Sequence, residues 1–518
     1  MVVSLLSDPR SVLAEGMLEG IEEGPPVSKR RLVVLWVGQL VFFLALRYFF
    51  RRLTKPKFMV YPRQSWLLKV LNVVLWPACV LVDTVRYKVP VIGFMLVRPL
   101  SIERLALAAE RRTGLSDWGE SKTFPSLYEM ALRRMNEVKL SPFGRLLTFD
   151  YLLRRLELRL HLVKHLKEEK DRPELTVRPM VVMGLPRTGT TLVHRLLALD
   201  PEARYPKTFE LLDPLNPRKF DEKKRINYVK SKLNLIKRVI PHIEAIHELG
   251  PEEAEECFLG LSVDVPMLPP TFRHLVRHCV GDDFLVDKVI FPDLSDAYRL
   301  YKRQLQCISS SEKKRWVLKC PAHLGFVSDL YSAFPDADIV WTHRDPAEAL
   351  PSLGSLFRTF ADMAESHDIN LHAIGQEQLV YWAAALQRAH KQVKQNHVAH
   401  VHFESLMADP IKAIEHIYAT FNYTLSDTFR HNMTTYLKEN QQKRATIPYH
   451  LKQFHTYSLQ DYGLHVKDLH KAMHSYYANY LPTALLQQDK KKHNKLSDDD
   501  QKSPPAAPPT DAQTKKIN

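Results

Sequence analysis

The fold of this chain is decided by the stretch Met180-Val181-Val182-Met183-Gly184-Leu185-Pro186-Arg187-Thr188-Gly189-Thr190-Thr191. Its apolar start predicts a short buried strand, and Leu192, Leu196 and Leu199 recur at helical spacing directly after it. We therefore expect a glycine-containing loop between a strand and a helix. At such a junction, loop N–H groups and the unpaired N–H groups of the first helical turn meet, and the helix dipole favours negative charge. The sequence predicts a site for a phosphate-like anion.

The loop differs from a Walker A loop in the position of its cation. Gly184 and Gly189 have the Walker A separation, but Thr190 replaces the lysine that reaches the β- and γ-phosphates. The cation is instead Arg187, inside the loop. Such a loop fits a phosphate-linked anion held without a metal ion, and an ordinary strand-to-helix turn is the alternative. The hydroxyl donors that remain are Thr188, Thr190 and Thr191.

The stretch from Gly184 to Thr191 resembles the 5′-phosphosulfate loop of sulfotransferases that use 3′-phosphoadenosine 5′-phosphosulfate (PAPS) as donor. A second resemblance lies at 338–352, where a strand is expected to end at Arg344 and a helix to carry Ser352. In the family, an arginine and a serine at this separation bind the donor's 3′-phosphate, through a forked guanidinium and a hydroxyl. Phe403 resembles an aromatic residue that approaches the adenine, although core packing explains it equally well.

Three residues are candidates for the chemistry. Lys319 and His323, at the end of a predicted strand, are similar to the Lys-x-His pair of cytosolic sulfotransferases, with a longer spacing. The resemblance implies that the lysine neutralises the departing oxygen and that the histidine accepts the acceptor's proton. Glu210 lies where other branches have a glutamate as general base. Helix capping is the alternative for His323, and an ordinary solvated loop residue is the alternative for Glu210.

Composition narrows the class of ligand. Lys and Arg number 73 against 58 for Asp and Glu, a formal net charge of +15, which fits an anionic co-substrate or an anionic membrane surface. We expect no nucleic-acid partner, because the sequence has no aromatic-interleaved basic array and no zinc-finger spacing. The 5 cysteines are scattered and predict neither a disulfide framework nor a metal cluster. No metal is expected.

Two regions before the glycine loop have distinct patterns. After a flexible N-terminus at 1–28, residues 29–99 are predicted to associate with a membrane, because the apolar run from Leu32 to Phe50 is near the lower limit for a bilayer span. A buried soluble helix is the alternative. Residues 100–174 predict a helical cap, whose arginines are interpreted as solvated helix faces: Arg133, Arg134, Arg154 and Arg155.

Signals elsewhere concern capping and location. Pro251, followed by Glu252 and Glu253, predicts a helix start. The tail at 487–518 lacks the apolar content to fold, and its Lys515-Lys516-Ile517-Asn518 end resembles a dilysine retrieval signal. Sequons at Asn422 and Asn432 compete with this signal, since they matter only in a lumen. We expect an endoplasmic reticulum or Golgi membrane location, with the side of the catalytic domain and the oligomeric state open.

Together these patterns predict an α/β fold with a P-loop-like central parallel sheet, built from strands near 180, 316, 339 and 400 and flanked by helices. The resemblance is to the broad, bacterial-like sulfotransferase branch, with the sulfotransferase domain at 175–486. It implies transfer of a sulfuryl group from PAPS to an acceptor hydroxyl of a lipid, sterol or other amphipathic alcohol. A P-loop nucleotide kinase or NTPase, and a catalytically silent nucleotide-binding membrane scaffold, are the alternatives.

Overall fold

The computed structural model describes the following residues: 70–71, 100–137, 140–169, 178–217, 219–240, 243, 249–266, 276, 280, 289–309, 314–365, 369–446 and 458–481. The predicted flexible N-terminus and disordered tail lie outside these residues, as does the predicted membrane-associated region apart from Val70 and Leu71. Within the described ranges, no helix combines the length and apolar character needed to cross a bilayer.

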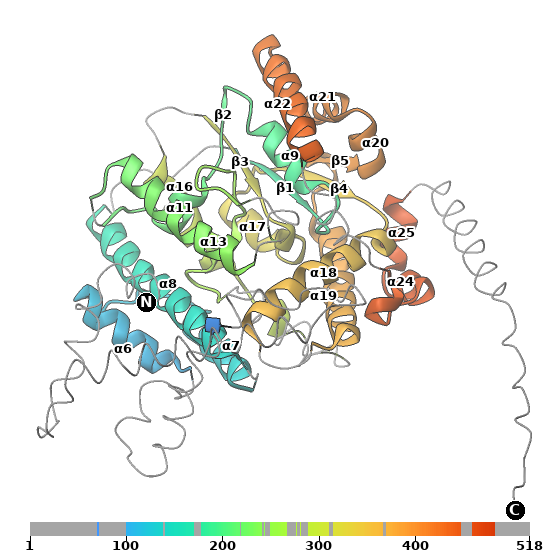
Figure 1. The fold of residues 1–518 in the computed structure, drawn as a ribbon. Coiled ribbons are helices and arrows are strands. Elements are labelled where there is room, and N and C mark those ends of the chain that lie inside the picture. The colour runs from blue at the N-terminus through green and yellow to red at the C-terminus, as the bar shows by residue number, and fades with distance from the viewer. Residues whose placement is uncertain are drawn as a thin grey trace, which may run out of the picture.

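A five-stranded parallel sheet forms the centre of the fold, in the order β2-β3-β1-β4-β5 (Figure 1). The strands near 180, 316, 339 and 400 are confirmed. The two-residue edge strand β2 is too short to give a hydrophobic pattern and was not predicted. Because all strands are parallel, their carboxyl ends meet at one edge of the sheet. The strands are β1 (Met180–Gly184), β2 (Ala203–Arg204), β3 (Arg315–Lys319), β4 (Asp338–His343) and β5 (Val398–His402).

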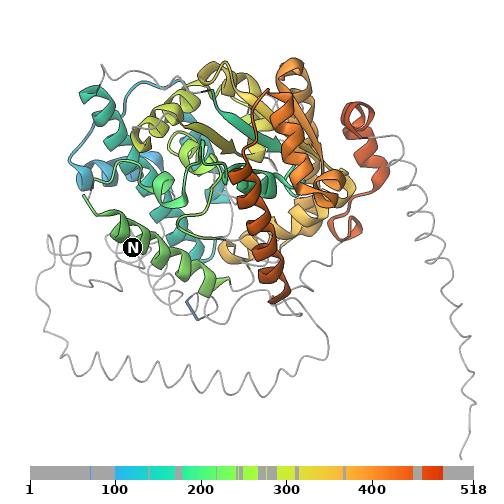
Figure 2. The ribbon, with the colours of Figure 1, turned by 90° about the horizontal axis from the view of Figure 1, so that it is seen from above.

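Helices cover both faces of the sheet, as the strand pattern requires. Alternate strand residues point to opposite faces, so Val181 and Met183 join one buried cluster while Met180 and Val182 join another. Figures 1 and 2 show the helices on the two sides. The first cluster includes α16 (Ser295–Ile308), α17 (Val327–Ala333) and α19 (Leu371–Gln392), and the second includes α9 (Thr190–Leu197), α21 (Pro410–Thr420) and α22 (Asp427–Thr446).

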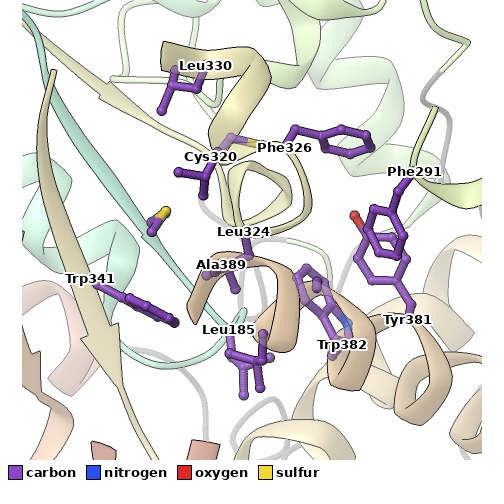
Figure 3. Packing of buried hydrophobic residues seen from close by; sticks show 14 of the residues in the cluster. Leu185, Phe291, Cys320, Leu324, Phe326, Leu330, Trp341, Tyr381, Trp382 and Ala389 are labelled. Carbon is purple, nitrogen blue, oxygen red and sulfur yellow. The ribbon is translucent and has the colours of Figure 1, made fainter. Parts of the chain in front are cut away.

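The first cluster anchors the glycine loop. Leu185, the residue after β1, is fully buried and belongs to the same cluster as Trp341 of β4 and Trp382 of α19 (Figure 3). Burying such a leucine contributes about 1.5–3 kcal/mol. The start of the loop is therefore held by the core, which limits how the rest of the loop can move.

The predicted helical cap contains α6 (Ile102–Thr113), α7 (Ser126–Glu137) and α8 (Pro142–Glu168), which lie at the opposite end of the molecule from α22 (Figure 1). The interpretation of its arginines as solvated is wrong for Arg155. Its side chain is 3% exposed, and Nη2 donates to the carbonyl oxygen of Leu212 at 2.9 Å. The apolar positions around Arg155 on α8 face the core, so its guanidinium reaches the end of α10 (Thr208–Leu212) instead of solvent.

The helix predicted to begin at Pro251 is absent, and the next helix begins at Phe258. The backbone between them pairs with a neighbouring segment: the carbonyl oxygens of Pro251 and Glu253 accept from the N–H groups of Phe209 and Thr208. The other helices with described bounds are α10 (Thr208–Leu212), α11 (Glu222–Val239), α13 (Phe258–Leu261), η2 (Pro321–Gly325), α18 (Pro346–Ala364), η3 (Gln395–His397), α20 (Phe403–Ala408), η5 (Gln460–Tyr462), α24 (Val466–Ala472) and α25 (His474–Tyr480).

Candidate active site

The loop between β1 and α9 is shaped by close contacts at both of its glycines. A Cβ atom on Gly184 would lie 2.2 Å from Oγ1 of Thr342, and one on Gly189 would lie 2.5 Å from Cδ2 of Leu406. Gly189 also caps α9 with φ of 91°, which side chains disfavour. Both positions therefore require glycine for space and, at Gly189, for backbone conformation.

The loop threonines divide into two groups. Thr188 is fully buried, and its hydroxyl donates to the carbonyl oxygen of Leu185 at 2.6 Å and lies 2.6 Å from Oγ1 of Thr342. It therefore stabilises the shape of the loop. Thr190 and Thr191 begin α9, so they lie beside the first-turn N–H groups, which have no partner within the helix.

Four residues predicted to bind the donor meet beside the loop, and we refer to Arg187, Arg344, Ser352 and Phe403 as the anion cluster. Nε of Arg187 donates to Oγ of Ser352 at 2.9 Å, and Nη1 of Arg344 donates to the carbonyl oxygen of Arg187 at 2.9 Å. The guanidinium carbon of Arg344 lies 4.0 Å from the ring centre of Phe403. Two guanidinium groups, a hydroxyl and an aromatic ring thus surround one loop, the set of groups that a phosphorylated nucleotide needs.

One carboxylate also contacts the anion cluster. Nη2 of Arg344 donates to Oε2 of Glu348, in the first turn of α18 (Pro346–Ala364), at 2.8 Å. The carboxyl group is 45% exposed. An exposed ion pair contributes little to stability, so a phosphate can replace this carboxylate on Arg344 at small cost.

Lys319 lies next to the loop strand. It is opposite Val182 of β1 in the register, and its side chain points to the α9 face because Val317, two residues earlier, belongs to that face. Nζ donates to Oε1 of Glu256 at 2.5 Å, with the lysine side chain 2% exposed and the glutamate 20% exposed. The structure thus places a paired lysine at the carboxyl end of β3, as the resemblance implies, with a partner that sequence analysis did not select.

His323 is buried in η2 and its side chain has no solvent-exposed surface. Its Nδ1 lies 2.7 Å from the hydroxyl of Tyr298, and the flanking Cys320 and Leu324 belong to the first cluster (Figure 3). Burial, together with the charge of Lys319, lowers the pKa of His323 to about 3. The imidazole is therefore neutral at pH 7, but an acceptor has no open access to it.

Glu210 makes contacts that close the first turn of α10. Oε2 accepts from the backbone N–H of Lys207 at 3.0 Å, and Oε1 pairs with Nη2 of Arg204 at 3.1 Å. Arg204 belongs to the edge strand β2, which β3 separates from β1. The cavity that Glu210 lines has a volume of about 490 Å³ and lies at this edge. The structure does not bring Glu210 into the anion cluster.

Sequence reasoning missed two residues of this site. Thr342 lies in the strand predicted from the apolar residues near 339, and nothing in that pattern indicates a contact with the loop. Its hydroxyl nevertheless lies within hydrogen-bonding distance of the hydroxyl of Thr188. Glu256 ends a run of acidic residues that looked like helix capping. Glu256 directly precedes the apolar segment Cys257–Leu261. That segment could have indicated that the chain enters the core at this point.

Comparison with known proteins identifies the family. Residues 179–427 match the family model described as the sulfotransferase family. Over this region the chain belongs to the sulfotransferase family. Two curated relatives, each named omega-hydroxy-beta-dihydromenaquinone-9 sulfotransferase Stf3, come from Mycobacterium bovis and Mycobacterium tuberculosis. Both are 26% identical over 183 residues, which are 34% of this chain and 44% of each relative, so the matched part spans less than half of their length.

Solved sulfotransferases share the fold. The crystal structure of STF1 from Mycobacterium tuberculosis has 24% identity and a TM-score of 0.57, covering 72% of this chain and 98% of that chain. The structure of STF9 from Mycobacterium avium has 23% identity and a TM-score of 0.60, covering 74% of this chain and 97% of that chain. The chain therefore shares its fold with these sulfotransferases.

The expected endoplasmic reticulum or Golgi location is wrong. The sulfotransferase relatives come from mycobacteria, which have neither compartment, and the described residues contain no membrane-spanning helix. The motifs behind the expectation are short, and a lysine-rich tail matches a dilysine signal by chance. One sequon is also part of the fold, because Nδ2 of Asn432 donates to the carbonyl oxygen of Leu199 at 3.1 Å.

Proposed function

We propose that this chain transfers a sulfuryl group from PAPS to the hydroxyl of a lipid, sterol or other amphipathic alcohol. The observation that carries the proposal is the anion cluster beside the glycine loop, in a chain of the sulfotransferase family. Thr190 occupies the position of the Walker lysine, which disfavours a kinase or NTPase.

The donor would lie along the loop. The loop N–H groups at Gly184 and Arg187–Gly189 and those of the first turn of α9, with Thr190 and Thr191, would hold the 5′-phosphosulfate, aided by the side chain of Arg187. Arg344 and Ser352 would bind the 3′-phosphate, and Phe403 would contact the adenine. Pro186 has no N–H group and contributes by restricting the backbone. The donor requires no metal for binding, because the guanidinium groups supply the positive charge.

The chemistry proposed is an in-line displacement at sulfur. A bond forms between the acceptor oxygen and sulfur while the bond from sulfur to the 5′-phosphate oxygen breaks, and the electron pair stays on that oxygen. Lys319 would neutralise the charge that develops there. The resemblance assigns proton removal to His323 or Glu210, and their burial and contacts give this assignment little support.

The acceptor class is supported by the relatives. Their printed name describes a sulfotransferase acting on an omega-hydroxylated dihydromenaquinone, a hydroxyl on a long apolar molecule. With 26% identity over part of each chain, this similarity supports an amphipathic alcohol as a class and does not extend to the menaquinone itself.

Titration calorimetry of the purified full chain with 3′-phosphoadenosine 5′-phosphate, in the absence of metal, tests the donor site. We expect wild type to bind and Arg344→Ala to bind about 10- to 100-fold more weakly, because charge-assisted hydrogen bonds contribute about 1.5–3 kcal/mol. Arg358→Ala is the matched control, since Arg358 lies on α18, the helix that follows Arg344, and pairs with Asp362.

Two results would contradict the proposal. If wild type ignores this nucleotide and binds ATP with Mg²⁺, the chain is kinase-like. If it binds the nucleotide but moves no label from ³⁵S-labelled PAPS to any alcohol in a panel of sterols, quinone-derived alcohols and long-chain alcohols, nor to water, it is a silent nucleotide-binding protein.

A further inference from the structure

The proposed reaction needs a group that accepts the acceptor's proton, and the two residues chosen from sequence are poorly placed for it. His323 has no exposed surface, and Glu210 is used by Lys207 and Arg204 at the sheet edge. A general base must lie within hydrogen-bonding distance of the acceptor's hydroxyl group. The acceptor must also be able to reach it from solvent. A carboxylate at the carboxyl end of the sheet, next to Lys319, would meet both conditions.

Glu256 satisfies this requirement. Its Oε1 accepts from Nζ of Lys319 at 2.5 Å, so the carboxylate lies beside the cation assigned to the departing oxygen. Lys319 is almost fully buried, whereas 20% of the Glu256 side chain is exposed. Its second oxygen, Oε2, has no hydrogen-bond partner among the described residues, and a carboxylate oxygen accepts readily from a hydroxyl.

The backbone holds Glu256 in this position. The N–H of the next residue, Cys257, donates to the carbonyl oxygen of Lys319 at 2.9 Å. This hydrogen bond joins the segment that carries Glu256 to the end of β3, beside the ion pair. The N–H of Glu256 itself donates to Oε1 of Glu255 at 2.8 Å. Glu255 is buried and its other oxygen accepts from the hydroxyl of Thr208 at 3.4 Å. Glu256 is therefore presented from a rigid segment, as a catalytic group needs to be.

We propose, on the basis of the proposed function, that Glu256 is the general base of the sulfuryl transfer. The acceptor's O–H proton passes to Oε2 of Glu256 as the acceptor oxygen bonds to sulfur, and the sulfur–oxygen bond to the 5′-phosphate breaks with its electron pair on the departing oxygen. Negative charge thus leaves the carboxylate while it appears on that oxygen. Lys319 has three N–H donors, so one ammonium group neutralises both charges in turn.

The charge transfer explains why a buried lysine is tolerated here. Before the reaction, Glu256 compensates the ammonium, which would otherwise be costly to bury. After proton transfer, the departing phosphate oxygen provides that compensation. The ammonium of Lys319 therefore faces a negatively charged oxygen both before and after the step.

The test uses the full chain and needs no identified acceptor, because water also donates a proton when it accepts the sulfuryl group. Single-turnover release of ³⁵S-sulfate from labelled PAPS is measured for wild type and Glu256→Gln, alongside calorimetric binding of 3′-phosphoadenosine 5′-phosphate. The amide can still accept from Lys319. We expect nearly unchanged nucleotide binding and a transfer rate reduced about 100- to 10,000-fold, the usual contribution of a general base.

Two further variants separate catalysis from structure. Formate added to Glu256→Ala should restore part of the transfer rate, because it replaces the missing carboxylate, and a purely structural role predicts no such recovery. Glu253→Gln is the control from the same acidic run; its side chain is 41% exposed and pairs with Arg195, and we expect the wild-type rate.

The outcomes distinguish the two proposals. If wild type binds the nucleotide and Glu256→Gln transfers sulfuryl at the wild-type rate, the assignment of Glu256 is overturned while the proposed function stands. If wild type binds no nucleotide and releases no sulfate, the proposed function fails, and this assignment fails with it.

Discussion

Arg187 has a left-handed backbone conformation, with φ of 72°, in the middle of the glycine loop. For a residue with a side chain this costs about 1–2 kcal/mol, and such strain is often kept where a side chain must point in one direction. Here the direction is toward Ser352, 165 positions later in the chain. Arg187 therefore keeps an unfavourable backbone conformation, which directs its side chain toward the site.

Ser352 tests how strongly the anion cluster depends on one hydroxyl. Ser352→Ala removes the acceptor for Nε of Arg187 and a proposed donor to the 3′-phosphate. We expect binding of 3′-phosphoadenosine 5′-phosphate to weaken about 3- to 10-fold, because one hydrogen bond contributes about 0.5–1.5 kcal/mol. Calorimetry measures this. Ser355→Ala, one turn along α18, should bind like wild type, and equal affinities for all three proteins would exclude a role of Ser352.

Gly189 tests the shape of the loop. Gly189→Ala combines an unfavourable φ of 91° with a Cβ atom 2.5 Å from Leu406, so we expect about 2–4 kcal/mol lower stability and loss of nucleotide binding. Thermal unfolding and calorimetry check the two effects. Gly114→Ala is the matched control: φ is 69°, but no atom lies within 4 Å of the new Cβ. It should lose only about 1 kcal/mol.

Helix α8 depends on a buried arginine for its contact with the sheet domain. Arg155 donates to the carbonyl oxygens of Leu211 and Leu212 at 3.4 and 2.9 Å. These carbonyls lie at the end of α10, where a helix leaves its last carbonyl oxygens without a partner inside the helix. A helical pattern predicts α8, but it does not say that an arginine on the inner side of the helix meets these carbonyls. The contact joins the helical cap to the element that carries Glu210.

Replacement of Arg155 by methionine preserves the size of the side chain and removes its donors. We expect Arg155→Met to reduce the free energy of unfolding by about 2–3 kcal/mol, because buried acceptors lose charged partners. Arg133→Met on α7 is the control, since Arg133 is exposed, and it should change stability by less than about 0.5 kcal/mol. Denaturant titrations compare the two. Equal losses would show that burial of Arg155 is unimportant.

The whole molecule should become unstable in mild acid. Burial, and secondarily the charge of Lys319, lowers the pKa of His194 and of His323 to about 3, and burial lowers the pKa of His343 well below its usual range. An unfolded histidine has a pKa of about 6.5. Between these values the unfolded chain binds more protons, so the stability present above pH 6.5 falls as the pH drops toward 3.

Each such histidine contributes about 1.4 kcal/mol of lost stability per pH unit inside this window. The denaturation midpoint should therefore fall steeply as the pH is lowered from 7.5 to 5. In His194→Gln, the free energy of unfolding should change less steeply with pH, by the amount that corresponds to about one bound proton. Gln can still donate to the carbonyl oxygen of Val317, which lies 3.3 Å from Nε2 of His194. His465→Gln, at an exposed position, should leave the slope unchanged. A wild-type stability independent of pH in this range would contradict the argument.

The sequence by itself determined what short-range spacing encodes. The apolar run and the glycines placed a loop between β1 and α9, and the same patterns predicted β3, β4 and β5 and the helix that carries Ser352. A two-residue edge strand has no hydrophobic period, and neither has the backbone pairing of residues 251–255. The sequence therefore did not predict β2, and it wrongly predicted a helix that begins at Pro251.

Only the tertiary structure decided which side chains meet. Lys319 and Glu256 are 63 positions apart, and Arg187 and Ser352 are 165 apart. Their contacts depend on the strand order β2-β3-β1-β4-β5, which places β3 and β4 on either side of the loop strand. Spacing along a chain sets local conformation, whereas burial and partner choice depend on how the sheet and its helices pack. For this reason Glu256, rather than the predicted His323 or Glu210, lies next to the lysine.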